Sequence, residues 1–186
     1  MSFTWTAHRF AGGALALDVA NTVVLRFDPQ RRIDRFADFA AMDSFADAAN
    51  LYGAERERFG PLGPARPEDR KSLLELREAT DRHVRAIIRA EDRPYLLADL
   101  LEAIAAILRR TPRRGSSVAL DAATAHSALS LVANPETDRL KICPNCEWLF
   151  LDRSRNRSRT WCDMAVCGNR TKARRHYRRN REETQP

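Results

Sequence analysis

The chain contains the stretch Cys143-Pro144-Asn145-Cys146 and, further along, Cys162-Asp163-Met164-Ala165-Val166-Cys167; these two pairs hold all 4 of its cysteines. Two thiolates separated by two residues reach one metal ion from a tight turn, and a second pair completes the tetrahedral shell of structural zinc. Pro and Asn inside the first pair favour such a turn. The spacing therefore predicts a structural Zn²⁺ site at Cys143, Cys146, Cys162 and Cys167.

The position of the last cysteine indicates how the zinc module folds. Cys167 precedes a predicted helix, whose free N–H groups and dipole stabilise a thiolate. A turn with two ligands, a short hairpin and a helix carrying the last ligand is a treble-clef-like order. A catalytic zinc keeps an open position and a nearby carboxylate, whereas here four cysteines close the shell. We expect the metal to hold this small module together.

The same cysteines would also suit disulfides, buried free thiols or an iron–sulfur cluster. Disulfides need an oxidising compartment, and the first residues, MSFTWTAHRF, do not resemble a secretory leader. The sequence also lacks the run of about 18 apolar residues that would predict a membrane span. We therefore favour zinc and expect a cytoplasmic protein with reduced thiols and no membrane partner.

Charge is distributed unevenly along the chain. Residues 1–138 contain 19 Lys and Arg against 20 Asp and Glu, whereas residues 139–186 contain 13 against 5. The excess positive charge therefore belongs to the zinc module and favours an anionic partner, with nucleic acid as the first candidate. The candidate nucleic-acid-binding residues are Arg153, Arg155, Arg157, Arg159, Arg170, Lys172, Arg174, Arg175, Arg178, Arg179 and Arg181.

These basic residues follow two patterns. The residues from Arg153 to Arg159 alternate with small polar ones, so an extended segment would place their guanidinium groups on one side. The residues from Arg170 to Arg181 are predicted to surround a helix, with Tyr177 as the candidate for stacking on a base. A solvated basic surface is the alternative. Attraction to an anionic membrane is disfavoured, because the helix has almost no apolar face.

The rest of the chain is predicted to be helical. Apolar periodicity predicts helices over 36–52, with a break near residues 42–44, and over 73–88, 96–108 and 120–132. The third of these is apolar over a wide arc, so we expect it to be central. Strands are expected near the N-terminus and in the zinc hairpin. The fold class is mainly α, with a multihelical domain over 1–138 and the zinc module over 139–186.

Asp18 and Asn21 are polar residues among small apolar neighbours. One interpretation is helix capping and buried hydrogen bonding inside the domain. The other is a ligand pocket lined by Asp18 and Asn21, and we favour the first. We do not expect an enzyme, because no phosphate loop, dinucleotide fingerprint or nucleophile motif is present. The histidines outside the basic helix stand alone in the sequence: His8, His83 and His126.

Several segments resemble a known family. WLFLD (148–152), SRNRSR (154–159), WCDMAVCGNR (161–170) and KARRHYRR (172–179) closely resemble the CGNR zinc finger, named for Cys167-Gly168-Asn169-Arg170. Upstream, GGALALDVANTV (12–23) and LLELREATDRHVRAI (73–87) resemble the ABATE domain that accompanies it.

The resemblance implies a bacterial, stress-related transcription regulator whose finger binds nucleic acid, with DNA favoured. It implies zinc on the same four cysteines, a close turn at Gly168 and helix capping by Asn169. The helical domain would sense a small-molecule effector or form a homodimer. The alternatives are an RNA-binding protein and an adaptor whose zinc module docks an acidic protein partner.

Overall fold

The computed structural model describes residues 3–91, 93–111, 117–133, 136–174 and 177. The α-helices are α1 (Leu15–Ala20), α2 (Phe39–Tyr52), α3 (Arg56–Phe59), α4 (Arg70–Ile88), α5 (Pro94–Leu108) and α6 (Leu120–Ala133). The strands are β1 (Val23–Val24), β2 (Ile33–Asp34), β3 (Leu62–Gly63), β4 (Val118–Ala119), β5 (Leu140–Ile142) and β6 (Leu149–Leu151). The protein is mainly helical, as the periodicity predicted.

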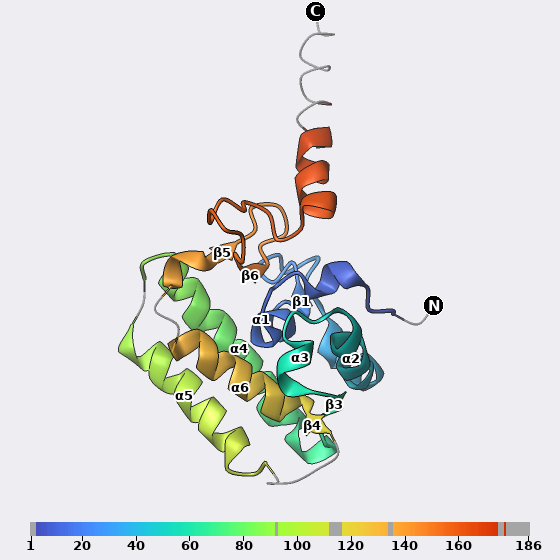
Figure 1. The fold of residues 1–186 in the computed structure, drawn as a ribbon, viewed down its shortest axis with the longest axis vertical. Helices are drawn as coiled ribbons and strands as arrows, with labels where there is room; N and C mark the ends of the chain where they lie inside the picture. Colours follow the sequence, from blue (N-terminus) through green and yellow to red (C-terminus); the bar gives the residue numbers. More distant parts are fainter. Residues whose placement is uncertain (1–2, 92, 112–116, 134–135, 175–176, 178–186) are drawn as a thin grey trace, which may run out of the picture.

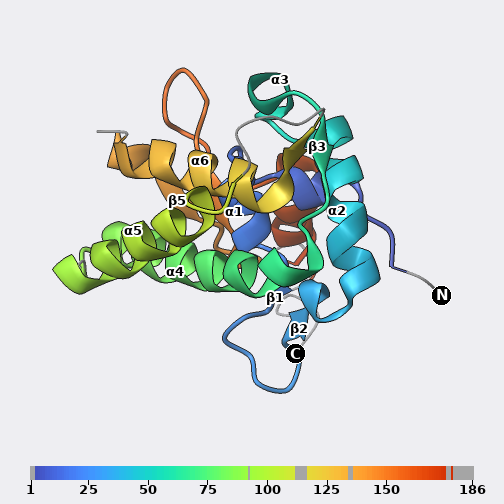
Figure 2. The same cartoon turned by 90° about the horizontal axis from the view of Figure 1, so that it is seen from below.

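The short helix α1 lies at the centre of the molecule. Every residue of Leu15–Ala20 is buried, and α1 contacts both α4 and α6. Figure 2 shows α1 surrounded by α2, α4 and α6. Small residues such as Ala16 and Ala20 allow the helix to be enclosed in this way, with Asp18 as its one polar residue.

Helices α4, α5 and α6 lie side by side (Figure 1). Leu76 of α4 shares an apolar cluster with Leu100 and Ile104 of α5. The expectation that α5 is central is wrong, because α5 packs against α4 and α6 on one face only and exposes Tyr95 and Leu101. Within the described part of the chain, no helix combines the length and hydropathy needed to cross a membrane.

Helix α2 differs from its prediction at its start. Phe36 belongs to a separate 3-10 turn (Arg35–Ala37), and α2 runs unbroken from Phe39. The break lies at Asp38, whose side chain accepts the N–H of Ala40 at 2.9 Å and caps the helix. The predicted break near residues 42–44 is therefore wrong. The expected end is right, since Gly53 follows the last helical residue.

The strands form three separate pairs. β1 and β2 pair antiparallel, as do β5 and β6, whereas β3 and β4 pair in parallel. The β3–β4 pair joins residues 62–63 to residues 118–119 and was not expected from the sequence. Two residues per strand are too few to show the alternation that identifies a strand.

The β5–β6 hairpin shares a core with the helices. Leu140 and Leu149 of the hairpin pack with Leu17 of α1 and Val84 of α4 in one apolar cluster. We call this contact between α1, α4 and the hairpin the seam. The boundary after residue 138 was placed from composition and remains a prediction; the apolar cluster at the seam includes residues from both sides of it.

Candidate metal centre and basic surface

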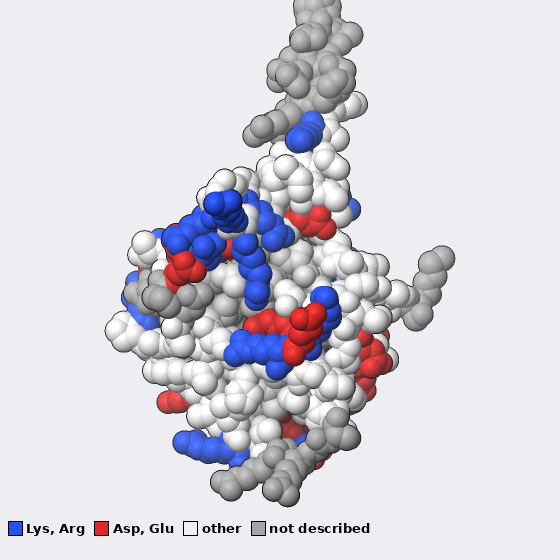
Figure 3. Space-filling model, viewed as in Figure 1, with Lys and Arg blue, Asp and Glu red and all other residues white. Residues whose placement is uncertain are grey.

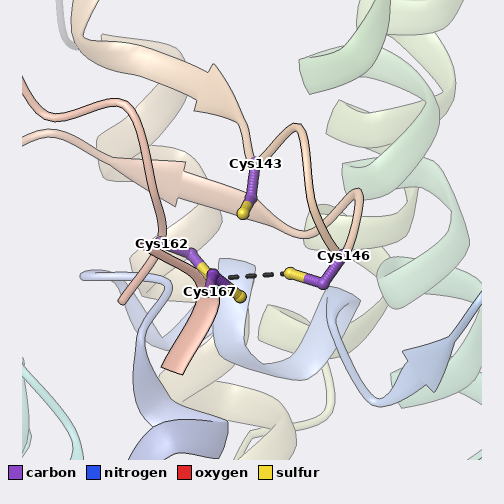
Figure 4. A group of neighbouring side chains, drawn as sticks. All are labelled: Cys143, Cys146, Cys162 and Cys167. Carbon is purple, nitrogen blue, oxygen red and sulfur yellow. Dashed lines mark hydrogen bonds between the residues drawn. The ribbon is translucent and has the colours of Figure 1, made fainter. Parts of the chain in front are cut away.

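The first cysteine pair occupies the turn of the β5–β6 hairpin. The N–H of Cys143 donates to the carbonyl of Trp148 at 2.9 Å, and the N–H of Glu147 donates to the carbonyl of Cys143 at 2.8 Å. Glu147 adopts a left-handed φ of 60° to close the turn. The sulfurs of Cys143 and Cys146 consequently point into the same space (Figure 4).

The second pair lies at a π-helical turn, Met164–Gly168. Asp163 caps this turn, because its side chain accepts the N–H of Val166 at 3.2 Å. The capping role expected for Asn169 therefore belongs to Asp163. A Cβ at Gly168 would meet the flexible, exposed side chain of Met164, which would have to move, and would lie 3.3 Å from Cδ1 of Trp161.

The four sulfur atoms fit one tetrahedral metal ion. All lie within 4.8 Å of one another, with Cys146 and Cys162 at 3.5 Å and Cys162 and Cys167 at 3.6 Å. Zn–S bonds of about 2.3 Å in a tetrahedron place the sulfurs about 3.8 Å apart. The donor set is four cysteines with no protein position left open, which is the chemistry of structural Zn²⁺.

Hydrogen bonds among the thiols shift their pKa values in opposite directions. Cys146 and Cys162 donate to Cys143, so the pKa of the Cys143 thiol is lowered. The same bonds raise the pKa of Cys146 and of Cys162. Zn²⁺ binds thiolates, so it must displace the protons held in this cluster. Zinc affinity should therefore fall as the pH falls.

Aromatic side chains surround the metal site. Trp148 and Phe150 are buried in one cluster with the cysteines, and Trp161 packs against it. Val24, next to α1, joins the same cluster. The aromatic residues after the first cysteine pair thus form the apolar shell of the site.

Asn21 joins α1 to the hairpin. Its side-chain nitrogen donates to the carbonyl of Leu149 at 2.8 Å, and its oxygen accepts the N–H of Leu149 at 2.9 Å. Both halves of the amide are therefore occupied by backbone. This is the buried hydrogen bonding that the sequence favoured for Asn21 over a ligand pocket.

Asp18 is 1% exposed and has an unusual environment for a carboxyl group. One oxygen accepts the N–H of Gly12 at 2.7 Å, while Oδ2 has no hydrogen-bond partner in the described structure. Burial raises the pKa of Asp18 well above its usual value, against the opposing effect of the Gly12 bond. A Cβ at Gly12 would lie 2.6 Å from the carboxylate, so this contact requires glycine.

His8 supports the metal site and was not identified from the sequence. Its Nδ1 lies 2.8 Å from Oδ2 of Asp163, and its ring stacks on Trp148 with 5.3 Å between centroids. Partial burial raises the pKa of Asp163, but hydrogen bonds from His8 and from the N–H of Val166 outweigh it and lower the pKa. No local spacing signals a pair separated by 155 residues.

Asp152 organises the loop that follows β6. It is fully buried and accepts the backbone N–H groups of Ser154 and Arg159, each at 2.9 Å. Nζ of Lys141 lies 2.7 Å from the same carboxylate. Burial alone would raise the pKa of Asp152, but these hydrogen bonds lower it. The carboxylate thus remains ionised and fixes both ends of the loop.

The alternating arginines lie in this loop and not in an extended strand. Strand β6 ends at Leu151, and Arg157 adopts a left-handed φ of 52° within a turn. The segment from Arg153 to Arg159 is therefore not continuously extended, which is the condition under which its spacing would place the four guanidinium groups on one side. The physical reason is Asp152, which draws the backbone of Arg159 back toward the start of the loop.

The four loop arginines differ in their partners. Nε of Arg153 donates to the carbonyl of Gly13 at 2.8 Å. Arg157 pairs with Glu136 and Asp138, and Arg159 lies over the ring of Phe150 with 5.1 Å to its centroid. Arg155 is exposed and has no hydrogen-bond or ion-pair partner among the described residues. Among these four arginines, Arg155 is thus the one whose charge is most available to a ligand.

The basic helix projects from the body of the molecule (Figure 1). Residues 169–174 are helical, and Arg170, Lys172 and Arg174 are exposed on them. Arg174 reaches back to the side chain of Asn145 in the first cysteine turn. Tyr177 is 67% exposed, which suits its predicted stacking role. The remaining candidates lie outside the described residues: Arg175, Arg178, Arg179 and Arg181.

Basic side chains gather over the zinc module on one face of the molecule. Figure 3 shows Lys and Arg covering this region, with a second, mixed group of basic and acidic side chains beside it on the helical body. On this face, the excess of basic residues in the sequence of the zinc module is visible as a basic surface.

No curated protein matches the chain. Residues 139–180 match the CGNR zinc finger family. All four cysteines that converge on one point lie inside the matched range. The family match and the convergence of Cys143, Cys146, Cys162 and Cys167 together indicate a zinc-finger module whose four cysteines fit a structural Zn²⁺ ion.

Proposed function

We propose that the protein is a bacterial transcription regulator that binds nucleic acid, preferably DNA, through its zinc finger. The observation that carries the proposal is a set of exposed cations on the module that contains the four cysteines. Arg155, Arg170 and Lys172 have no acidic partner within the described ranges, so their charge is available to phosphates. Contacts of this kind supply most of the affinity of sequence-independent binding.

The surroundings of these cations support a nucleic-acid partner. Arg170 and Arg174 are four residues apart and share one side of the helix, where like charges repel until phosphates neutralise them. Tyr177 offers an exposed ring to an unpaired base. Arg157 and Arg159 contribute less to our proposed interface, because they already have partners inside the protein.

We further propose that residues 1–138 form an ABATE domain with a sensory or dimerising role. The GGALALDVANTV segment contains the buried helix α1 and Asn21, which place it directly beneath the zinc finger. A signal received by the helices could thus act on the finger through the seam. We propose a binding protein of the cytoplasm, where thiolates remain available to zinc, and not an enzyme.

Binding of nuclease-treated, zinc-loaded protein to duplex DNA at increasing salt tests the proposal. Five engaged phosphates predict a log–log slope of about −4.5. The variants Arg170→Gln and Lys172→Gln should each reduce the magnitude of this log–log slope by about 0.9. Arg109→Gln, an exposed position at the end of α5, removes the same charge elsewhere and should leave the slope unchanged.

Three results would count against the proposal. Binding that ignores salt, or no binding at low salt with zinc confirmed present, would argue against an electrostatic interface. Structured RNA that competes better than duplex DNA would reassign the finger to RNA. A stable acidic protein partner in the absence of nucleic acid would favour the adaptor.

A further inference from the structure

A pocket of about 420 Å³ lies where the helical body meets the loop of the zinc finger. One wall comes from α3 and α6, and the other from β6 and the loop that follows it. The volume is within the range of about 300–1,000 Å³ that small-molecule sites occupy. Its polar lining includes Arg58, Ser127, Ser130, Arg139, Arg153 and Arg155.

The pocket has more basic than acidic groups, because four arginines face two carboxylates, Glu55 and Glu136. Glu55 is already satisfied: it accepts the N–H of Leu15 at 2.8 Å and pairs with Arg58 at 2.8 Å. Glu136 pairs with Arg139 at 2.8 Å and also with Arg157. The acids are therefore neutralised by the protein itself.

The arginines from the finger keep donors for a ligand. Arg155 has no hydrogen-bond or ion-pair partner in the described part of the chain. Arg153 uses Nε for the carbonyl of Gly13, and no acidic partner faces its other nitrogens among the described residues. On the opposite wall, Arg58 is 46% exposed at its side chain, although it already binds Glu55 through Nη1 and Ser130 through Nη2. Cations from two separate parts of the fold thus face one cavity.

We infer that this pocket binds a small molecule bearing carboxylate or phosphate groups. Planar guanidinium groups bind such oxyanions in paired, charge-assisted hydrogen bonds. A ligand here would contact Arg58 of the helical body and Arg153 and Arg155 of the finger, so it would bridge the two parts. The inference does not depend on nucleic-acid binding. Where both hold, ligand and nucleic acid compete for Arg155.

Calorimetric titration of the full-length, zinc-loaded protein tests the pocket without any nucleic acid present. Inorganic phosphate and succinate are the two probes, one for each oxyanion class. Arg155→Gln removes a side chain that has no described internal partner, so its fold should be intact. Both Arg155→Gln and Arg58→Gln should weaken the bound probe about tenfold, the loss expected for one charge-assisted hydrogen bond.

Two matched variants separate the pocket from general attraction to positive charge. Arg109→Gln removes a positive charge outside the pocket, and Arg170→Gln removes one on the basic helix. Both should bind the probe within twofold of the unmodified protein. The tighter of the two probes identifies the oxyanion class. If neither binds at millimolar concentration, or if Arg170→Gln loses binding while Arg155→Gln does not, the inference is overturned.

Discussion

Asn21 binds the backbone of Leu149 in both directions across 128 residues of sequence. A second polar contact crosses the seam: Arg153, which follows the hairpin, donates to the carbonyl of Gly13, which precedes α1. These polar contacts accompany the apolar cluster and fix its geometry, because a buried backbone group without a partner is costly. At the scale of single residues, the metal site therefore depends on side chains far from the cysteines.

Replacing Asn21 by Ala should destabilise the protein by about 2 kcal/mol, because the N–H and carbonyl of Leu149 would be buried without partners. Denaturant unfolding measures the loss. The same variant should release zinc to a chelator faster, since the hairpin is less firmly held.

Asn50 provides the matched control. Its side-chain nitrogen donates to the carbonyl of Leu62 at 2.9 Å, and its side-chain oxygen accepts the N–H of Leu62 at 2.8 Å. This reciprocal pair of hydrogen bonds lies away from the finger. Asn50→Ala should therefore lower stability without changing the rate of zinc release. Equal release rates in Asn21→Ala and the unmodified protein would contradict the role assigned to Asn21.

Asp18→Asn should change stability in a pH-dependent way. In the folded protein the pKa of Asp18 lies above its usual value of 3.8, so protonation of Asp18 stabilises the fold. This stabilisation is complete below pH 3.8 and is lost as the pH rises through the raised pKa. Asn keeps the acceptor for Gly12 and carries no charge. The stability of the variant relative to the unmodified protein should thus increase with pH, as followed by unfolding experiments between acidic and neutral pH.

Asp28→Asn should show the opposite trend. A hydrogen bond from Arg31 lowers the pKa of Asp28, so the stability that it contributes is present above its usual pKa and lost as the pH falls. The variant should therefore be less stable than the unmodified protein mainly at higher pH. The same pH trend in both variants would show that burial does not govern Asp18.

At the scale of elements, the sequence predicted the helices and turns that neighbouring residues determine. Helix α4 follows its apolar periodicity, and α6 spans the Ala-rich segment where a helix was predicted. The cysteine spacing identified the metal ligands, because a turn and a helix end are set by neighbouring residues. The location of α5 was predicted wrongly, since its composition shows how apolar it is but not which neighbours cover it. The pair of His8 and Asp163, like the β3–β4 pairing, depends on distant segments and left no pattern in the sequence.

The loop after β6 offers a prediction about one element. Asp152→Asn keeps an acceptor for the N–H of Ser154 but loses the charge that binds Lys141, so the loop should open more often. Trypsin should then cleave after Arg155, Arg157 and Arg159 several times faster, as measured by timed digestion and mass spectrometry. Unchanged cleavage would mean that Asp152 does not hold the loop.

The control for this experiment is Asp43→Asn. It removes a carboxylate that pairs with Arg70 at 2.7 Å between α2 and α4, far in sequence from the loop. Cleavage of the loop should stay at the rate of the unmodified protein. This separates release of the loop from general destabilisation.

At the scale of the whole molecule, the zinc finger and the helices share one apolar cluster. Removing zinc should therefore lower the melting temperature of the entire chain in a single transition. Trp5 lies in the helical core, whereas Trp148 and Trp161 surround the metal site. A protein with Trp148→Phe and Trp161→Phe keeps Trp5 as its reporter, and its fluorescence should change at the lower temperature after chelation.

Restoring Zn²⁺ should reverse the shift, which excludes damage by the chelator. If Trp5 reports the same melting temperature with and without zinc, the helical domain and the finger would be independent units. That result would favour the boundary after residue 138 as a true limit between two autonomous folds.

The position of the hairpin in the chain has a consequence for synthesis. A ribosome releases the N-terminal residues first, so Leu17 and Val84 emerge long before Leu140 and Leu149, which cover them. Until then the nascent chain exposes apolar surface on α1 and α4 and is open to aggregation and chaperones. Translation that stops before the first cysteine pair would leave a product that cannot complete its core, and cellular proteases would remove it.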